Sequence, residues 1–365
     1  MTGDEDYVAG KWVNRVYFTR EFPVKRDGAG RSARYVSRVF GLTRGFAHFD
    51  DFTKTGSEAV RSNSLAMLAV AALRKLGATV EPGRKQASRI NDEAVAWALR
   101  QQTPFFMFLN YFDGHRPYDP PAPFDTLFSG KPRRYRGDYT LAELPDTALA
   151  LRELLAGYDA AVAYQDAQLA SLFQRLEARG FLRNAIVIVT SDHGDLFGEH
   201  GLMGHGDNLY ALLLRVPLLW YAPGRLPTGA RIVTPVSLRD LAKSITSLAG
   251  DPSAAFPGVP FFGAPSSAPY GVGPVSPILS SLSEFSGTTM GPLRRGDMAS
   301  LIHGPWHYIL NGDGVEELYD LRRDTLGGTN VIAQQPFADT LYFLREQLRA
   351  LPLSRVSRRH LEGRQ

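Results

Sequence analysis

The stretch "NAIVIVTSDHGDLFGEHGLMGHG" (Asn184–Gly206) joins a continuous apolar run to a cluster of carboxylate and imidazole side chains. Its first part, up to Asp192, has the length and apolar character of a strand that is buried on both faces, as in a parallel sheet. The chain has only eight histidines, and three of them lie in this stretch. The stretch therefore predicts an α/β fold with a polar site at the end of a buried strand.

Two further apolar runs of strand length surround it, Pro104–Phe112 before it and Arg215–Pro223 after it. A long helix is predicted from about Asp146 to Arg179, with Gly180 as its C-cap. A buried strand, a helix and a second buried strand form the βαβ pattern of a parallel sheet with a right-handed crossover. We therefore expect a mostly parallel sheet sandwiched by helices.

The rest of the chain adds helices and a second, smaller fold. An amphipathic helix over Ser88–Gln102, capped near Asn91, precedes the first strand, and a helix over Ser237–Gly250 follows the third. A weakly helical stretch covers Ser57–Gly77, whereas residues 1–60 look irregular. We expect an α/β domain over residues 1–260, a Pro/Ser/Gly-rich connector over 261–277, and a small C-terminal antiparallel sheet with one helix and a basic tail over 278–365.

The composition excludes several classes of protein. The 365 residues are 44% hydrophobic and 21% charged, which is ordinary for a globular chain. A net charge of +4 is too small to indicate nucleic-acid binding. The absence of cysteine excludes disulfides, thiolate metal sites and a cysteine nucleophile. No signal peptide or apolar run long enough to span a membrane is present, and the sequence leaves compartment and oligomeric state open.

Two predicted strands end in carboxylate and imidazole side chains at the same edge of the sheet. Ligands of open α/β sheets bind beyond the carboxyl ends of the strands. Asp192 and His193 follow one strand, and together they offer oxygen and nitrogen ligands for Ca²⁺, Mg²⁺, Mn²⁺ or Zn²⁺. His115 follows the other strand in a proline-rich loop, where it is a candidate general acid or substrate contact. A capping aspartate, or a turn histidine that packs on Tyr118, would be the simpler interpretation.

The remaining polar residues of the stretch have weaker claims. His205 lies between two glycines and could approach an anionic group closely. Glu199 and His200 could orient their neighbours, and Asp195 is more often a helix N-cap in such a turn. For the histidines at positions 48, 303 and 307, surface or packing roles are the better interpretation.

These residues resemble the sulfatases of the alkaline-phosphatase-like superfamily. The segment Tyr158–Gly201 is similar to the family's long helix, strand and metal loop in unbroken order. "PFFMFLNYFDGHRPYDPP" (Pro104–Pro121) resembles the strand that ends in a proline-bracketed histidine. Later landmarks follow in the expected sequence, namely "RVPLL" (Arg215–Leu219), Val236–Gly250 and Trp306–Asp324, so the similarity covers nearly the whole chain.

The resemblance implies roles for four residues. Asp192 and His193 would be two ligands of a divalent metal, usually Ca²⁺ in sulfatases. His115 would contact the sulfate ester and help to protonate the leaving group. His205 falls where many relatives have a lysine that binds the sulfate oxygens. The implied substrate is an anionic small-molecule or glycan sulfate ester.

The sequence also departs from the family pattern. Sulfatases begin with a strand that carries an Asp-Asp metal pair, followed by C/S-x-P-x-R, whose first residue becomes the formylglycine nucleophile. No C/S-x-P-x-R is present, and Asp50-Asp51 follows "GFAHF", a different context. We therefore expect a chain that lacks the nucleophile, the first strand and half of the metal ligands, so that its activity alone is doubtful and its cation is held weakly.

Three functions remain open at this point. The first is sulfate ester hydrolysis by the intact protein. The second is phosphoryl chemistry on the same fold, as in a phosphate or phosphonate ester hydrolase or a phosphoethanolamine transferase. The third is a non-catalytic remnant that binds an anionic ligand or a partner. Metal analysis and turnover of aryl sulfate and aryl phosphate esters distinguish them.

Overall fold

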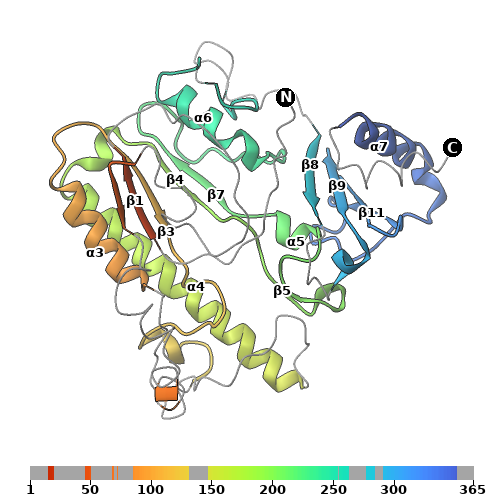
Figure 1. Ribbon diagram of the computed structural model, residues 1–365, viewed down its shortest axis with the longest axis horizontal. Helices are drawn as coiled ribbons and strands as arrows, with labels where there is room; N and C mark the ends of the chain where they lie inside the picture. The colour runs from red at the N-terminus through yellow and green to blue at the C-terminus, as the bar shows by residue number, and fades with distance from the viewer. Residues whose placement is uncertain are drawn as a thin grey trace. The chain divides into compact units, whose positions relative to one another are not determined.

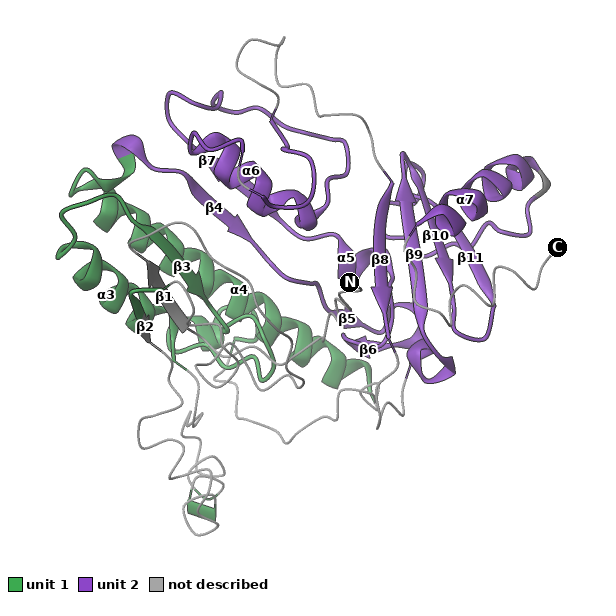
Figure 2. Ribbon diagram, turned by 45° about the horizontal axis from the view of Figure 1, so that its top comes forward, with its two compact units in different colours: residues 1–140, 145–182 green, residues 141–144, 183–365 purple. Residues whose placement is uncertain are grey.

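The computed structural model describes residues 15–19, 46–50, 68–69, 72, 85–130, 147–253, 255–262, 277–283 and 291–351. The chain divides into two compact units, residues 1–140 with 145–182 and residues 141–144 with 183–365 (Figure 2). Across the described ranges, no helix combines the length and apolar character that crossing a bilayer requires. Most of the helical stretch expected over Ser57–Gly77 lies outside these ranges.

The first unit holds a three-stranded sheet with the order β2-β1-β3. Strand β1 (Arg15–Thr19) pairs antiparallel with both β2 (His48–Asp50) and β3 (Phe106–Asn110). Two helices, α3 (Ala87–Ala98) and α4 (Ala148–Glu177), lie beside this sheet in Figure 1. The apolar run at β3 therefore forms the predicted strand.

The long helix of the first unit begins and ends where the sequence predicts. The Thr147 hydroxyl accepts a hydrogen bond from the amide of Ala150 at 3.1 Å, which caps the first turn of α4. Gly180 has a φ of +77° and its amide donates to the carbonyl of Glu177, as a C-terminal glycine does. Leu172 of this helix is buried in one apolar cluster with residues of α3, among them Ile90 and Ala94.

Two expectations for the first unit are wrong. Asn91 does not cap α3 but lies inside it, 1% exposed, where it accepts from the Tyr111 hydroxyl at 2.6 Å. The helix begins earlier, where the amides of Ala87 and Ser88 donate to the Asp113 carboxylate and the Tyr164 hydroxyl, partners that are distant in sequence. Residues 1–60 also contain two short strands, β1 and β2, and β1 pairs with both β2 and β3.

The second unit begins with the strand of the quoted stretch. Strand β4 (Val187–Thr190) pairs antiparallel with β7 (Leu218–Tyr221). The segments between and after them form a two-stranded hairpin and two helices: β5 (Leu196–Phe197), β6 (Met203–Gly204), α5 (Ala211–Leu214) and α6 (Leu241–Leu248). The predicted helix over Ser237–Gly250 is thus confirmed in its central part, after one 3₁₀ turn at Leu238–Asp240.

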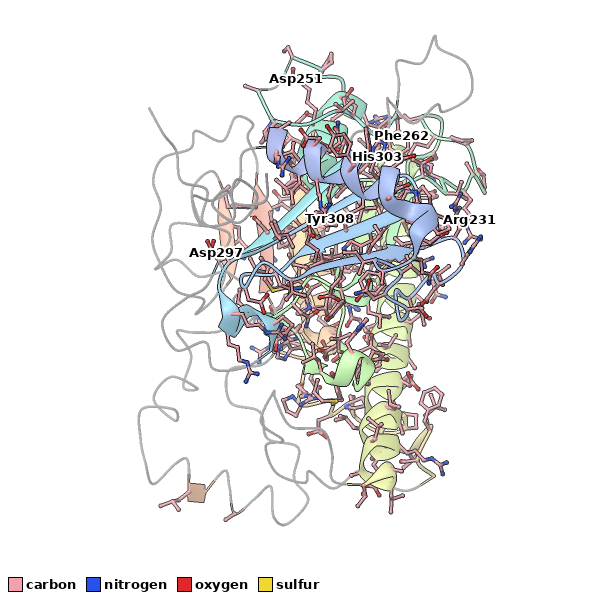
Figure 3. The ribbon with its side chains drawn as sticks, turned by 90° about the vertical axis from the view of Figure 1, so that its right-hand side faces the viewer. Arg231, Asp251, Phe262, Asp297, His303 and Tyr308 are labelled. Atoms are coloured by element: carbon pink, nitrogen blue, oxygen red, sulfur yellow. The ribbon has the colours of Figure 1, made fainter. Side chains whose placement is uncertain are left out.

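The C-terminal part of the second unit is an antiparallel sheet with one helix, as predicted. Its strand order is β11-β10-β9-β8, and the elements are β8 (Ile278–Leu282), β9 (Met298–His303), β10 (Trp306–Leu310), β11 (Glu316–Asp320) and α7 (Ala338–Ala350). Figure 3 shows α7 lying across this sheet, with the labelled Tyr308 beneath it. Leu344 and Leu348 of α7 are fully buried against Leu301 and Tyr308 of the sheet.

The α/β class is confirmed, but the direction of the strands differs from the expectation. All the strand pairs among the described residues are antiparallel, including those of β3 and β4, which we expected in a parallel sheet. Continuous apolar character also failed to predict burial, because no residue of β3 or β4 is fully buried and Phe108 is 43% exposed. It carries no information about which neighbour a strand pairs with, and this is where the expectation failed.

Candidate functional site

The polar residues of the quoted stretch lie where β4 ends and a short hairpin begins. Strands β5 and β6 pair in the register Leu196↔Gly204. This register brings the residue before β5, Asp195, next to the residue after β6, His205. The hairpin therefore folds the "GHG" sequence back onto the "SDHGD" sequence.

Gly194 is required at the start of this hairpin because the backbone passes very close to α5. A Cβ atom there would lie 2.0 Å from the backbone oxygen of Leu212. The Gly194 amide donates to the carbonyl of Leu213 at 2.9 Å, which fixes this approach. The glycine of the Asp-His-Gly sequence thus holds the polar loop on its scaffold.

Asp192 and His193 face each other through the atoms that a cation would bind. The Nδ1 atom of His193 lies 2.7 Å from the carbonyl oxygen of Gly194. A carbonyl can only accept, so Nδ1 carries the hydrogen and Nε2 of the neutral ring carries a lone pair. That Nε2 lies 3.6 Å from Oδ2 of Asp192, while Oδ1 of Asp192 accepts from the His193 amide at 3.1 Å.

This pair fits two ligands of one divalent cation. Metal–ligand bonds of about 2.0–2.4 Å that meet at about 90–110° separate two ligand atoms by about 2.8–3.9 Å. The two side chains are 44% and 30% exposed, for Asp192 and His193 respectively, so an ion can reach them. A hydrogen bond from the other ring nitrogen to a carbonyl is also the usual support of a metal-binding histidine. In the part of the chain that the structure describes, however, no group of three or more His, Cys, Asp or Glu side chains forms a metal site.

His205 joins this pair and brings a carboxylate of its own. Its ring lies against that of His193, with 4.0 Å between ring centroids and 30° between the planes. Its Nδ1 lies 3.0 Å from Oδ1 of Asp195. Asp195 is therefore not the helix N-cap that we expected, because a strand follows it and its carboxylate accepts from an imidazole. No sequence signal short of the hairpin register predicted this contact.

Glu199 and His200 support the hairpin tip. The Glu199 carboxylate accepts from the Phe197 amide at 2.6 Å. The His200 ring is stacked on Tyr210 at 3.6 Å between centroids, and the residue has a left-handed φ of 54°. Burial lowers the pKa of His200, although the nearby carboxylate of Glu317 acts in the opposite direction. Glu199 thus contacts the hairpin backbone and His200 packs on Tyr210, and the orienting role offered to both stays a prediction.

His115 belongs to the first unit, where the loop after β3 holds it. Its ring is stacked on Phe112, with 4.2 Å between centroids and 17° between planes. Its Nδ1 lies 2.6 Å from the carbonyl oxygen of Arg116, so Nδ1 carries the hydrogen. The amide of Gly114 donates to the side chain of Gln165 in α4, which ties the loop to this helix.

The histidines at positions 48, 303 and 307 lie in surface or packing positions, as the sequence suggested. His48 is exposed and lies 6.4 Å from the ring of Trp97, and His303 lies 5.2 Å from Phe343. His307 is fully buried in β10, and burial, with a smaller effect of His200, lowers its pKa to about 4. The structure thus brings Asp192, His193 and His205 together, and it places His115 in the other unit.

Comparisons with known proteins agree with this description. The family model described as Sulfatase matches residues 12–251. Arylsulfatase K of Xenopus laevis is 30% identical over 223 residues, which are 58% of this chain and 40% of that protein. An arylsulfatase of Clostridium perfringens is 25% identical over 272 residues, 67% of this chain and 53% of that protein. This chain thus spans about half the length, or less, of these curated relatives.

One solved structure extends the similarity to the fold. The crystal structure of a phosphonate monoester hydrolase of Agrobacterium radiobacter has a TM-score of 0.59 to this chain at 19% sequence identity. The similarity covers 81% of this chain and 69% of that one. At this level of identity the comparison establishes the fold and leaves the reaction open.

Proposed function

Because the chain belongs to the sulfatase family, we propose that it carries the part of a sulfate ester hydrolase site that binds a divalent cation and the ester oxygens. The observation that carries this proposal is the facing pair of Asp192 Oδ2 and His193 Nε2, 3.6 Å apart, with the His205 ring beside them. A cation and a nitrogen donor side by side suit a group with several negative oxygens. Hydrolysis would require the whole site, whereas Asp192, His193 and His205 would provide the contacts to the cation and to the ester oxygens.

Asp192 and His193 would hold the cation, which is Ca²⁺ in most sulfatases. A cation there would neutralise part of the charge of the ester and withdraw electrons from its sulfur. The hydrogen bonds to Ser191, His193 and Gly194 hold the loop ready, because they fix the Asp192 carboxylate and the tautomer of the His193 ring. The remaining ligands would be water or groups outside the described residues.

His205 would donate a hydrogen bond to a sulfate oxygen, in place of the lysine of many relatives. His115 would protonate the oxygen of the leaving group. Its Nδ1 already donates to the carbonyl of Arg116, so Nε2 would be the nitrogen that delivers the proton. The 365 residues contain no C/S-x-P-x-R sequence, and we assign no nucleophile.

Cation binding and ester turnover test the proposal separately. Titration calorimetry with Ca²⁺, Mg²⁺, Mn²⁺ and Zn²⁺ measures the first, and release of nitrophenol from nitrophenyl sulfate and nitrophenyl phosphate measures the second. We expect Asp192→Asn to weaken cation binding by about tenfold or more, since it removes the negative charge and one oxygen of one of the two protein ligands. Asp251→Asn, in the loop after α6, is the matched control and leaves binding unchanged.

Each outcome has a clear meaning. Faster turnover of the sulfate ester supports a sulfatase, whereas faster turnover of the phosphate ester supports the phosphoryl alternative on the same fold. Cation binding that is equal in wild type and Asp192→Asn contradicts the assignment of the pair. If the chain shows no cation binding and no turnover of either ester, the result supports a non-catalytic protein.

A further inference from the structure

The carboxylate of Asp195 and the imidazole of His205 form a partly buried pair at the base of the hairpin. Their side chains are 10% and 15% exposed, and Oδ1 lies 3.0 Å from Nδ1. The pair is fixed on both sides, because β5 follows Asp195 directly and β6 precedes His205 directly in the register Leu196↔Gly204. Backbone pairing therefore sets the distance between the two side chains.

We infer that Asp195 is a positioning residue that holds His205 in the orientation in which it binds an oxyanion. The inference rests on the proposed function and extends it, since it names the group that makes a histidine suitable at this position. Asp195 itself would not touch the ligand. It would act through the His205 ring.

The argument follows from the shapes of the two possible side chains. A lysine ammonium has three donors at the end of a flexible stem, so it reaches an oxyanion from many rotamers. An imidazole donates only in the plane of its ring, through one of two nitrogens. The Asp195 carboxylate engages Nδ1, which fixes both the ring plane and the nitrogen that a ligand meets, namely Nε2. An oxyanion would accept from Nε2, the nitrogen on the side of the ring away from the Asp195 contact.

Charge alone predicts the opposite effect of Asp195 on anion binding. A carboxylate near an anion repels it, so that its removal should tighten anion binding. Positioning predicts that its removal weakens binding, because His205 loses its orientation. The sign of the change therefore separates a positioning role from an incidental charge.

The first experiment reads the ring directly. Two-dimensional NMR of the full chain, labelled with ¹⁵N-histidine, reports which ring nitrogen carries hydrogen, and loss of a signal set in His205→Lys assigns His205. We expect hydrogen on Nδ1 in the wild-type protein and in Asp195→Asn, whose carbonyl can still accept. In Asp195→Ala we expect a mixture of the two tautomers, with hydrogen on Nδ1 in some molecules and on Nε2 in others. Unchanged His205 signals in Asp195→Ala would overturn the inference.

The second experiment measures the affinity for inorganic sulfate by NMR titration. We expect Asp195→Ala to weaken binding by about tenfold, the usual size of a lost charge-assisted hydrogen bond, and Asp195→Asn to stay within about threefold of wild type. In the His205→Lys background, Asp195→Ala should leave affinity unchanged or raise it. Tighter binding by Asp195→Ala in the wild-type background, or equal losses in both backgrounds, would overturn the inference.

Failure of the proposed function gives a different pattern. If the wild-type chain binds no sulfate, His205 has no anion-binding role, and the ring signals alone decide whether Asp195 holds it. Circular dichroism and urea unfolding of each variant establish that the fold is kept. Asp195→Asn, which preserves the size and the acceptor oxygen, keeps the test decisive if Asp195→Ala does not fold.

Discussion

The buried histidine of the C-terminal sheet makes a prediction that can be worked out in detail. His307 lies in β10, between β9 and β11, and its side chain is 0% exposed. Neither ring nitrogen has a hydrogen-bond partner among the described residues. We propose the substitution His307→Leu, which keeps a similar volume and removes both polar atoms.

The magnitude follows from the pKa of the ring in the two states. Burial and the neighbouring His200 lower the pKa of His307 from 6.5 to about 4 in the folded chain. Between these pH values the unfolded chain binds a proton that the folded chain does not, so the free energy of unfolding falls as the pH falls. The loss is about 1.4 kcal/mol per pH unit, which gives about 2 kcal/mol at pH 5.

We expect His307→Leu to remove this loss. At pH 7.5 the variant should be more stable than wild type by about 1 kcal/mol, because the buried ring nitrogens no longer lack partners. At pH 5 the advantage should grow to about 3 kcal/mol, as the proton-linked term of about 2 kcal/mol is added. Hydrogen exchange of peptides from residues 298–320, measured across a urea series, reports the stability of this sheet specifically.

The control is His303→Leu, at the partly buried end of the neighbouring strand β9. This variant should lose stability at β10 between pH 7.5 and pH 5 as the wild-type protein does. If wild type and His307→Leu lose stability in parallel between pH 7.5 and pH 5, the neutral buried state of His307 is refuted. A variant that is less stable than wild type at both pH values would show instead that His307 has a partner.

Three further predictions concern stability. Gly194→Ala should lower the free energy of unfolding by about 3 kcal/mol, because its Cβ would lie 2.0 Å from a backbone oxygen of α5. Gly201→Ala, which has open space around its Cβ, should lower it by about 1 kcal/mol. Urea unfolding midpoints of the two variants measure the difference. Thr147→Ala removes the cap of α4 and should cost about 1 kcal/mol in the same assay. Arg345→Met removes the two hydrogen bonds and the positive charge that Arg345 gives the buried Glu316 carboxylate, to which the Tyr308 hydroxyl still donates, and should cost about 3 kcal/mol, seen as faster exchange of the β11 amides.

Elements that depend on local patterns were predictable from the sequence. The length and terminal glycine of α4 could be predicted from its own sequence, and so could the apolar run that becomes β4. Strand direction was not predictable in this way, because β4 pairs with β7 and β3 with β1 through contacts that no local pattern records. The same holds for the start of α3, which Asp113 sets from 26 residues away.

The candidate site shows the same division between local and distant information. Asp192 and His193 are adjacent in sequence, so their common ligand role could be predicted from the strand end alone. The partner of His205 could not, because Asp195 reaches it only through the register of a hairpin with two residues in each strand. Such short strands carry too few residues for an alternating pattern to show.

The β5–β6 hairpin also packs against residues near the C-terminus. This packing is relevant to where the α/β part of the chain ends. Leu196 of β5 is fully buried in one cluster with Leu293, Ile309 and Tyr319, which belong to the C-terminal sheet and the turn before it. The Tyr319 hydroxyl donates to Glu317, and the Tyr319 ring lies edge-on to His200 at the hairpin tip. The boundary that we propose at residues 261–277 therefore separates two sheets in sequence but not in packing. A change in the C-terminal core should reach Asp195 and His205 through β5, since Leu196 of this strand is part of that core.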